Sequence, residues 1–199
     1  MTSCHRLPGI VASGGIMSFQ HRRQLGVEED ASPHYWGSAD KKDALSGYVV
    51  CAFMTPWWMC RKRDEELAIL LLDAEAVCTK PGVCFCPTNS AFNLYPAAMI
   101  VQRTGAVALD ECFENETTYQ AGSSEVFVPD VVPLSDFRGI VCCDREAGEY
   151  WIEQLNAAYD ELPEPRPTLP EGGPIPVASR GREGFYFPGD FTPRRRIRH

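Results

Sequence analysis

The chain has 199 residues, of which 44% are hydrophobic, and it carries a formal net charge of −8. This length suits one domain with appendages, and the apolar fraction is sufficient for a core, which excludes a fully disordered or fibrous chain. No apolar run reaches the length of about 18 residues that a membrane-spanning helix needs. The nearest, residues 44–60, is interrupted by Ser46, Gly47, Thr55 and Pro56, so we expect a soluble or peripheral protein.

Charge is distributed unevenly along the chain. Residues 46–162 contain 7 Lys and Arg against 18 Asp and Glu, a net charge of −11, whereas residues 163–199 contain 7 Arg against 4 acids. Residues 1–45 show no sustained hydrophobic period, and the last 37 residues hold eight of the 16 prolines. We therefore expect an extended N-terminal arm (1–44), a folded domain (45–162) and a Pro-, Gly- and Arg-rich C-terminal tail (163–199).

Short apolar segments follow one another through the expected domain. Runs of β-branched, aromatic or aliphatic residues bounded by turn residues predict strands. These runs occupy residues 45–54, 66–73, 82–87, 123–134 and 137–144. Thr104-Gly105 lies between two apolar stretches of residues 97–113, which predicts a hairpin there. Together these segments indicate an antiparallel sheet or a small barrel.

The segment that follows has the signals of a helix. Asp144 suits the N-cap position, and Pro163 ends the continuation. Apolar residues recur at intervals of three or four and predict one buried stripe. The stripe consists of Ala147, Trp151, Leu155, Ala158 and Leu162.

Several motifs in this order carry a resemblance to a known family. They are Ser46-Gly47-Tyr48-Val49, then Trp57-Trp58 with Arg61-Lys62-Arg63, and finally a strand followed by a helix that contains Trp151. Over residues 45–162 the chain resembles a pleckstrin-homology (PH) domain. The resemblance implies a mainly β (α+β) fold, a bent antiparallel β-barrel or sandwich capped by a C-terminal α-helix. It also implies that Gly47, Tyr48, Trp151 and Leu155 define the fold.

Arg61, Lys62 and Arg63 are candidate contacts for an anionic ligand or a phospholipid, because phosphoinositide head groups require several converging cations. Lipid-binding members of the family that the chain resembles also carry a basic residue early, on their first strand. That residue is missing here, because Val49, Val50 and Cys51 occupy the corresponding strand. The net charge of the domain also disfavours an anionic membrane. We favour an exposed charged loop or a protein contact.

Nine cysteines at irregular spacing do not indicate a disulfide framework. Buried free thiols in a reducing compartment are the favoured interpretation. Cys78, Cys84 and Cys86 leave a metal site open as an alternative, although the C-x2-C spacing of structural zinc sites is missing. Cys142-Cys143 lacks a nearby His that could activate a nucleophile. Without a catalytic motif, we expect no enzyme, no metal and no cofactor.

The tail holds two clusters: an aromatic one that could bind a partner protein or fold back on the domain, and a basic one that could contact a nucleic acid, an anionic lipid or an acidic protein surface. The aromatic cluster is Phe185, Tyr186, Phe187 and Phe191, and the basic cluster is Arg194, Arg195, Arg196 and Arg198. Aromatic anchors on extended segments are typical of docking into a partner's pockets. The acidic body disfavours a nucleic acid as the main partner.

These observations predict a non-catalytic scaffold or adaptor subunit of a larger protein assembly, with a cytoskeletal or microtubule-associated setting favoured. A phosphoinositide-dependent membrane-targeting module is one alternative. An accessory subunit of a mitochondrial complex is another, because residues 1–27 lack acids and carry three arginines. The expected location is the cytoplasm, with association with the cytoskeleton, or else the mitochondrion.

Overall fold

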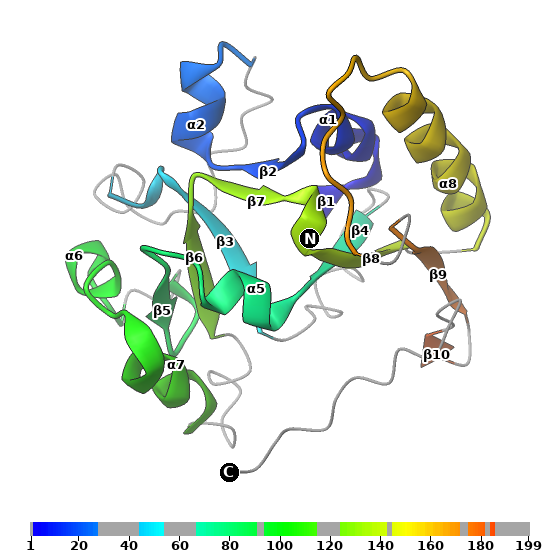
Figure 1. Cartoon of the computed structure of the whole chain (residues 1–199). Helices are drawn as coiled ribbons and strands as arrows, with labels where there is room; N and C mark the ends of the chain where they lie inside the picture. Colours follow the sequence, from blue (N-terminus) through cyan, green and yellow to red (C-terminus); the bar gives the residue numbers. More distant parts are fainter. Residues whose placement is uncertain are drawn as a thin grey trace.

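The computed structural model describes residues 2–27, 44–53, 67–90, 94–114, 124–142, 145–171, 175–181 and 184–185 (Figure 1). The strands are β1 (Thr2–Ser3), β2 (Gly15–Met17), β3 (Tyr48–Ala52), β4 (Leu67–Leu72), β5 (Cys84–Cys86), β6 (Glu125–Pro129), β7 (Val131–Pro133), β8 (Phe137–Cys142), β9 (Val177–Gly181) and β10 (Gly184–Phe185). The helices are α1 (Leu7–Ala12), α2 (Phe19–Gln24), α5 (Ala74–Cys78), α6 (Ala97–Ile100), α7 (Gly105–Glu114) and α8 (Arg145–Asp160), with 3-10 turns at Cys4–Arg6 and Leu134–Asp136.

The described strands form three sheets, in the orders β1-β4-β8-β9-β10, β3-β6-β5 and β2-β7. All of their pairings are antiparallel except that of β8 with β9, which is parallel. The α+β class is therefore confirmed, and β3, β4, β5, β6, β7 and β8 lie within the segments predicted as strands. The barrel is wrong, because the described strands form separate sheets and none of these sheets closes on itself.

Parallel neighbours need a long crossover connection, and α8 supplies it between β8 and β9. Trp151 and Leu155 are buried on one side of α8, so the apolar stripe is confirmed at these two positions. The helix packs mainly against β9 and α1, where it covers the larger sheet beside α1 (Figure 1). The expectation that this helix caps a barrel is therefore wrong. The predicted N-cap, Asp144, lies outside the described residues.

The N-terminal segment is folded rather than extended over residues 2–27. Cys4, Leu7 and Val11 are buried in the main core, while β1 pairs with β4 and β2 pairs with β7. Pro8 stands in the first turn of α1, where its missing N–H costs nothing. These residues cannot form a core alone, but they contribute to one shared with α8 and the sheets. The extended arm is thus wrong for residues 2–27, and the domain division at residue 44 stays a prediction.

The predicted hairpin over residues 97–113 is also wrong, because α6 and α7 occupy this segment. Gly105 has a φ of 79° and starts α7 rather than forming a two-residue turn. Ala108 and Cys112 are buried four residues apart on one face of α7. This spacing is helical, but the two small side chains made the pattern inconspicuous.

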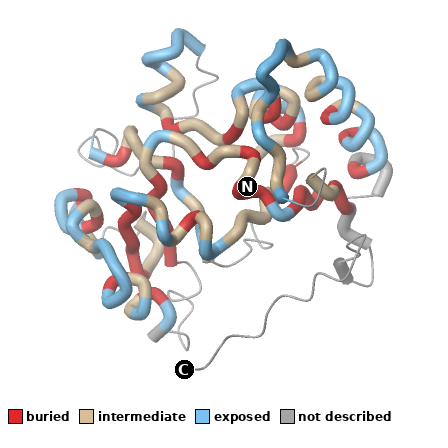
Figure 2. The backbone as a smooth tube through the Cα atoms, viewed as in Figure 1, coloured by how far each residue is buried: buried red, intermediate tan, exposed pale blue. Residues whose placement is uncertain are grey.

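The three-stranded sheet β3-β6-β5 carries apolar residues on both faces. Val126 and Val128 of β6 belong to the main core, whereas Phe127 lies in a second cluster with residues of β5 and α6. Buried residues follow the strands and the inner sides of the helices, and exposed residues follow the outer sides of α6, α7 and α8 (Figure 2). None of the helices in the described part of the chain is long and apolar enough to span a membrane.

Candidate functional site

Two carboxylates are buried in the described part of the chain, Asp136 and Glu125. Asp136 precedes β8 and forms an ion pair of 2.9 Å with Lys80, which compensates its charge. Glu125 is 9% exposed, and its Oε2 accepts a hydrogen bond of 2.8 Å from the backbone N–H of Ser90. A carboxylate is costly to bury, so its place on an otherwise apolar strand points to a specific use.

Glu125 lies at one end of the sheet β3-β6-β5. It is the first residue of β6 and stands opposite Ala52, the last residue of β3, and Cys86, the last residue of β5. Directly opposed residues of antiparallel strands present their side chains on the same face. Ala52 is exposed. The carboxylate therefore belongs to the terminal row of the sheet β3-β6-β5.

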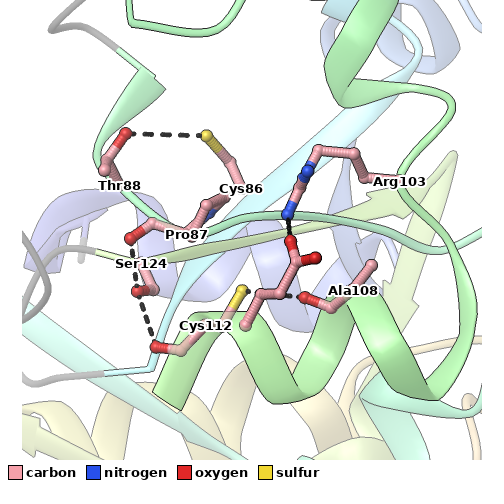
Figure 3. A network of polar contacts seen from close by, with 8 residues as sticks. Cys86, Pro87, Thr88, Arg103, Ala108, Cys112 and Ser124 are labelled. Atoms are coloured by element: carbon pink, nitrogen blue, oxygen red, sulfur yellow. Dashed lines mark hydrogen bonds and ion pairs between the residues drawn. The ribbon is translucent and has the colours of Figure 1, made fainter. Parts of the chain in front are cut away.

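Ser124, the residue before this carboxylate, is 1% exposed and is central to a polar network (Figure 3). Its hydroxyl lies 3.0 Å from the carbonyl oxygen of Pro87 and 3.0 Å from that of Cys112. Its own carbonyl accepts a 3.2 Å hydrogen bond from the N–H of Phe53. The start of β6 is thus tied to the ends of β3, β5 and α7.

A second link in the same region holds α7 against β5. Arg103 forms an ion pair with Glu111, and its guanidinium stands 5.2 Å from the centroid of the Tyr95 ring. The Arg103 carbonyl accepts a 2.9 Å hydrogen bond from the N–H of Phe85 (Figure 3 shows the ion pair). The connection before α7 is therefore fixed to the strand that pairs with β6.

The thiols around this region are poor nucleophiles. Burial raises the pKa of Cys51 to about 12, with further increases from the Cys78 thiol and the Glu125 carboxylate. Burial likewise raises the pKa of Cys112 to about 12, and the nearby Cys86 adds to that effect. Because the thiolate is the reactive form, these side chains stay unreactive near neutral pH. The carboxylate is the chemically useful group of this site.

The predicted burial of the thiols is confirmed at Cys84, Cys86 and Cys142, whereas Cys78 is half-buried. Burial also raises the pKa of Cys78 and of Cys84 to about 11. Within the described ranges, no group of three or more His, Cys, Asp or Glu is arranged to hold a metal ion. The reducing compartment stays a prediction.

Most predicted contact residues lie outside the described part of the chain. These are the basic cluster Arg61, Lys62 and Arg63, the tail aromatics Tyr186, Phe187 and Phe191, and the tail arginines Arg194, Arg195, Arg196 and Arg198. Phe185 belongs to β10, in register with Arg180 of β9. Their roles in binding stay untested predictions. Part of the tail is nevertheless structural, since β9 adds a strand to the larger sheet.

Gly47, Tyr48 and Trp151, which were expected to define a PH-like fold, make other contacts in this structure. The Gly47 carbonyl accepts a 2.8 Å hydrogen bond from the N–H of Asp130, and Tyr48 begins β3 with its ring edge-on to Phe127 at 6.4 Å. Burial raises the pKa of Tyr48. Trp151 contacts the ring of His5 edge-on at 5.5 Å, which links α8 to the N-terminal segment.

Glu125 was not among the residues predicted to be functional, because residues 123–134 were predicted only as a strand. The available signal was an acid inside the apolar run Glu125-Val-Phe-Val128. An acid that begins a strand ordinarily faces solvent. Its neighbours in the fold, Ala52 and Cys86 across the strands and Ser90 through a hydrogen bond, are distant in sequence.

No protein-family model and no curated protein matches this sequence. Solved structures do match the fold. The chain is similar to Thermosipho africanus DarTG in complex with ADP-ribose, with a TM-score of 0.54 and 15% identity over 85% of this chain. It spans about half of that DarTG chain, 48% of its length.

Two structures of DarT from Thermus sp. 2.9 are similar over 83% of this chain and 90% of theirs, each with 14% identity. The complex with NAD+ gives a TM-score of 0.53, and the complex with carba-NAD+ gives 0.52. The PH-like resemblance is therefore wrong, because the fold is that of DarT. The functions predicted from sequence are wrong as well: the non-catalytic scaffold and the phosphoinositide-binding module, which were built on this resemblance, and the mitochondrial accessory subunit, which was inferred from the composition of residues 1–27. By its architecture the chain shares the fold of DarT.

Proposed function

We propose that this protein is an ADP-ribosyltransferase that binds NAD+ and uses Glu125 to assist cleavage of the bond between nicotinamide and ribose. The supporting observation is a buried carboxylate in the terminal row of the sheet β3-β6-β5, in a fold shared with solved structures that hold NAD+ or ADP-ribose. NAD+ and ADP-ribose differ by the nicotinamide group. A fold that accommodates both suits a reaction in which nicotinamide leaves. The proposal includes a catalytic role, contrary to the absence of enzymatic activity expected from sequence.

The chemistry requires stabilisation of positive charge. When the bond between ribose C1′ and the nicotinamide nitrogen breaks, its electron pair leaves with nicotinamide, which becomes neutral. The ribose then develops oxocarbenium-like charge, shared between C1′ and the ring oxygen, as in glycoside cleavage. An acceptor attacks C1′ and loses a proton, or water attacks and yields ADP-ribose. A fixed carboxylate next to the ribose stabilises the developing charge.

Two features of Glu125 suit this role. Its burial lowers the local dielectric, so the interaction of its carboxylate with a developing cation is stronger than in water. The hydrogen bond from the Ser90 N–H fixes one carboxylate oxygen of Glu125. The carboxylate is therefore oriented before a ligand binds. Such a preorganised group needs no reorientation during the reaction.

The test measures nicotinamide release from NAD+ by chromatography, with NAD+ affinity measured separately by calorimetry. Glu125→Gln keeps the size of the side chain and removes its charge, so turnover should fall about 100- to 1000-fold. The affinity for NAD+ should change only a few-fold, because the charge acts on the transition state. Glu153→Gln, at an exposed position of α8, is the matched control and should keep full turnover.

Two results would count against the proposal. One is a parent protein that neither binds NAD+ nor releases nicotinamide. The other is a Glu125→Gln variant that turns over NAD+ as fast as the Glu153→Gln control. NAD+ labelled on its adenine then separates transfer from hydrolysis, because a transferred label stays on the acceptor whereas hydrolysis releases free ADP-ribose.

A further inference from the structure

The turn that follows β5, residues 87–90, is held at its two ends by two consecutive residues, Ser124 and Glu125. The Pro87 carbonyl lies 3.0 Å from the Ser124 hydroxyl, and the Ser90 N–H donates to Glu125 at 2.8 Å. Side chains of consecutive residues in extended backbone project to opposite sides. Ser124 and Glu125 therefore hold the first and the last residue of the same short turn.

The Ser124 hydroxyl has a second acceptor in the Cys112 carbonyl, also at 3.0 Å. Cys112 lies in the last turn of α7, where carbonyl groups have no partner within the helix. A hydroxyl carries one hydrogen, so it donates to one of these two carbonyls at a time. The carbonyl oxygens of Pro87 and Cys112 both lie within hydrogen-bond distance of the hydroxyl of Ser124, which is 1% exposed.

We propose that Ser124 is a positioning residue that orients the Glu125 carboxylate through this turn, an inference that rests on the proposed function. Loss of the hydroxyl frees the Pro87 carbonyl, and the turn can then shift at its first residue. The Ser90 N–H moves with the turn, so the hydrogen bond that fixes Oε2 of Glu125 weakens. Misplacement of a catalytic group by about 1 Å is enough to lower turnover about 100-fold.

The tested variants are Ser124→Ala and Ser124→Cys, because the thiol keeps a comparable size but is a weak donor. Ser18→Ala is the matched control: Ser18 is equally buried, at 1% exposure, and its hydroxyl caps α2 by accepting from the His21 N–H. With NAD+ as the substrate, both Ser124 variants should lose about 10- to 100-fold in kcat with little change in NAD+ affinity. Ser18→Ala should keep its kcat while its melting temperature falls.

A double variant separates positioning from general destabilisation. If Ser124 acts through Glu125, then Ser124→Ala combined with Glu125→Gln should turn over NAD+ no more slowly than Glu125→Gln alone. Additive losses in the double variant, or an equal loss of kcat in Ser18→Ala, would overturn the positioning role.

A second readout does not depend on activity. Amide hydrogen exchange at Ser90, measured by NMR, should accelerate about tenfold in Ser124→Ala and stay unchanged in Ser18→Ala. Unchanged exchange at Ser90 in Ser124→Ala overturns the inference even if NAD+ is a substrate. A parent protein without NAD+ turnover would instead refute the proposed function, and the exchange measurement would still decide whether Ser124 holds the turn.

Discussion

The backbone N–H of Ser90 donates a hydrogen bond of 2.8 Å to Oε2 of Glu125, joining the turn after β5 to the first residue of β6. Because the carboxylate satisfies a backbone donor, it has a structural role besides the proposed catalytic one. The two roles separate by substitution, since an amide side chain retains an oxygen acceptor and a methyl group does not.

Glu125→Gln should therefore change the free energy of unfolding by less than about 1 kcal/mol, whereas Glu125→Ala should lower it by about 1–3 kcal/mol because the Ser90 N–H loses its acceptor. Urea unfolding followed by circular dichroism measures both. Glu153→Ala, at an exposed position, should stay within about 0.5 kcal/mol of the parent. Equal losses in the Gln and Ala variants would show that the hydrogen bond contributes nothing.

Trp151→Ala should lower the free energy of unfolding by about 3–5 kcal/mol, because the side chain is 4% exposed and packs in the core where α8 meets the N-terminal segment. Its neighbour Tyr150 is 53% exposed, so Tyr150→Ala is the matched control and should cost much less. Thermal and urea unfolding give both values. A negligible effect of Trp151→Ala would contradict the burial of the stripe on α8.

Local patterns in the sequence were sufficient for part of this fold. β6, β8 and α8 were predicted because hydrophobic period and turn residues are local signals. The parallel pairing of β9 with β8 was not predictable, since it depends on a strand contributed by a Pro-rich tail. Without that pairing, a strand followed by a helix bearing Trp151 looked the same as the end of a PH domain.

The candidate site was less predictable than the strands that carry it. Glu125 was placed in a strand correctly, but its neighbours Ala52, Cys86 and Ser90 are brought to it by the fold from other segments. Ser124 likewise gains its acceptors from the ends of β5 and α7. α7 itself was predicted as part of a hairpin, so the hydrogen bond between Ser124 and the Cys112 carbonyl of this helix could not be inferred.

The buried thiols should react slowly. Because burial raises the pKa of Cys112 to about 12 from its ordinary value of 9.0, alkylation by iodoacetamide at pH 8 should be about 100- to 1000-fold slower in the folded protein than in urea. Mass spectrometry of the labelled peptides resolves each cysteine. Equal rates for Cys112 in the folded and unfolded chains would contradict its burial.

The same pKa shifts predict a loss of stability in base. The folded pKa values of Cys51 and Cys112 lie above the unfolded value, so the stabilisation that goes with the neutral thiols is complete below about pH 9 and is lost as the pH rises from 9 toward 12. Urea unfolding between pH 8 and about pH 11 should therefore show a decreasing midpoint. An increase in the midpoint over this range would reverse the expected sign.

Gly15→Ala tests whether the N-terminal segment is an integral part of the fold. Gly15 of β2 has a φ of 155°, and a Cβ atom there would meet the Val132 carbonyl oxygen and would lie 2.8 Å from Cα of Pro133, both backbone atoms that cannot move aside cheaply. We expect a loss of about 1–3 kcal/mol in the free energy of unfolding. Gly9 in α1 is the matched control, since nothing lies within 4 Å of a Cβ at that position, and Gly9→Ala should stabilise the protein by about 0.5–1 kcal/mol through helix propensity. If residues 2–27 were instead an extended arm that contributes little to the core, both substitutions would leave the unfolding midpoint unchanged.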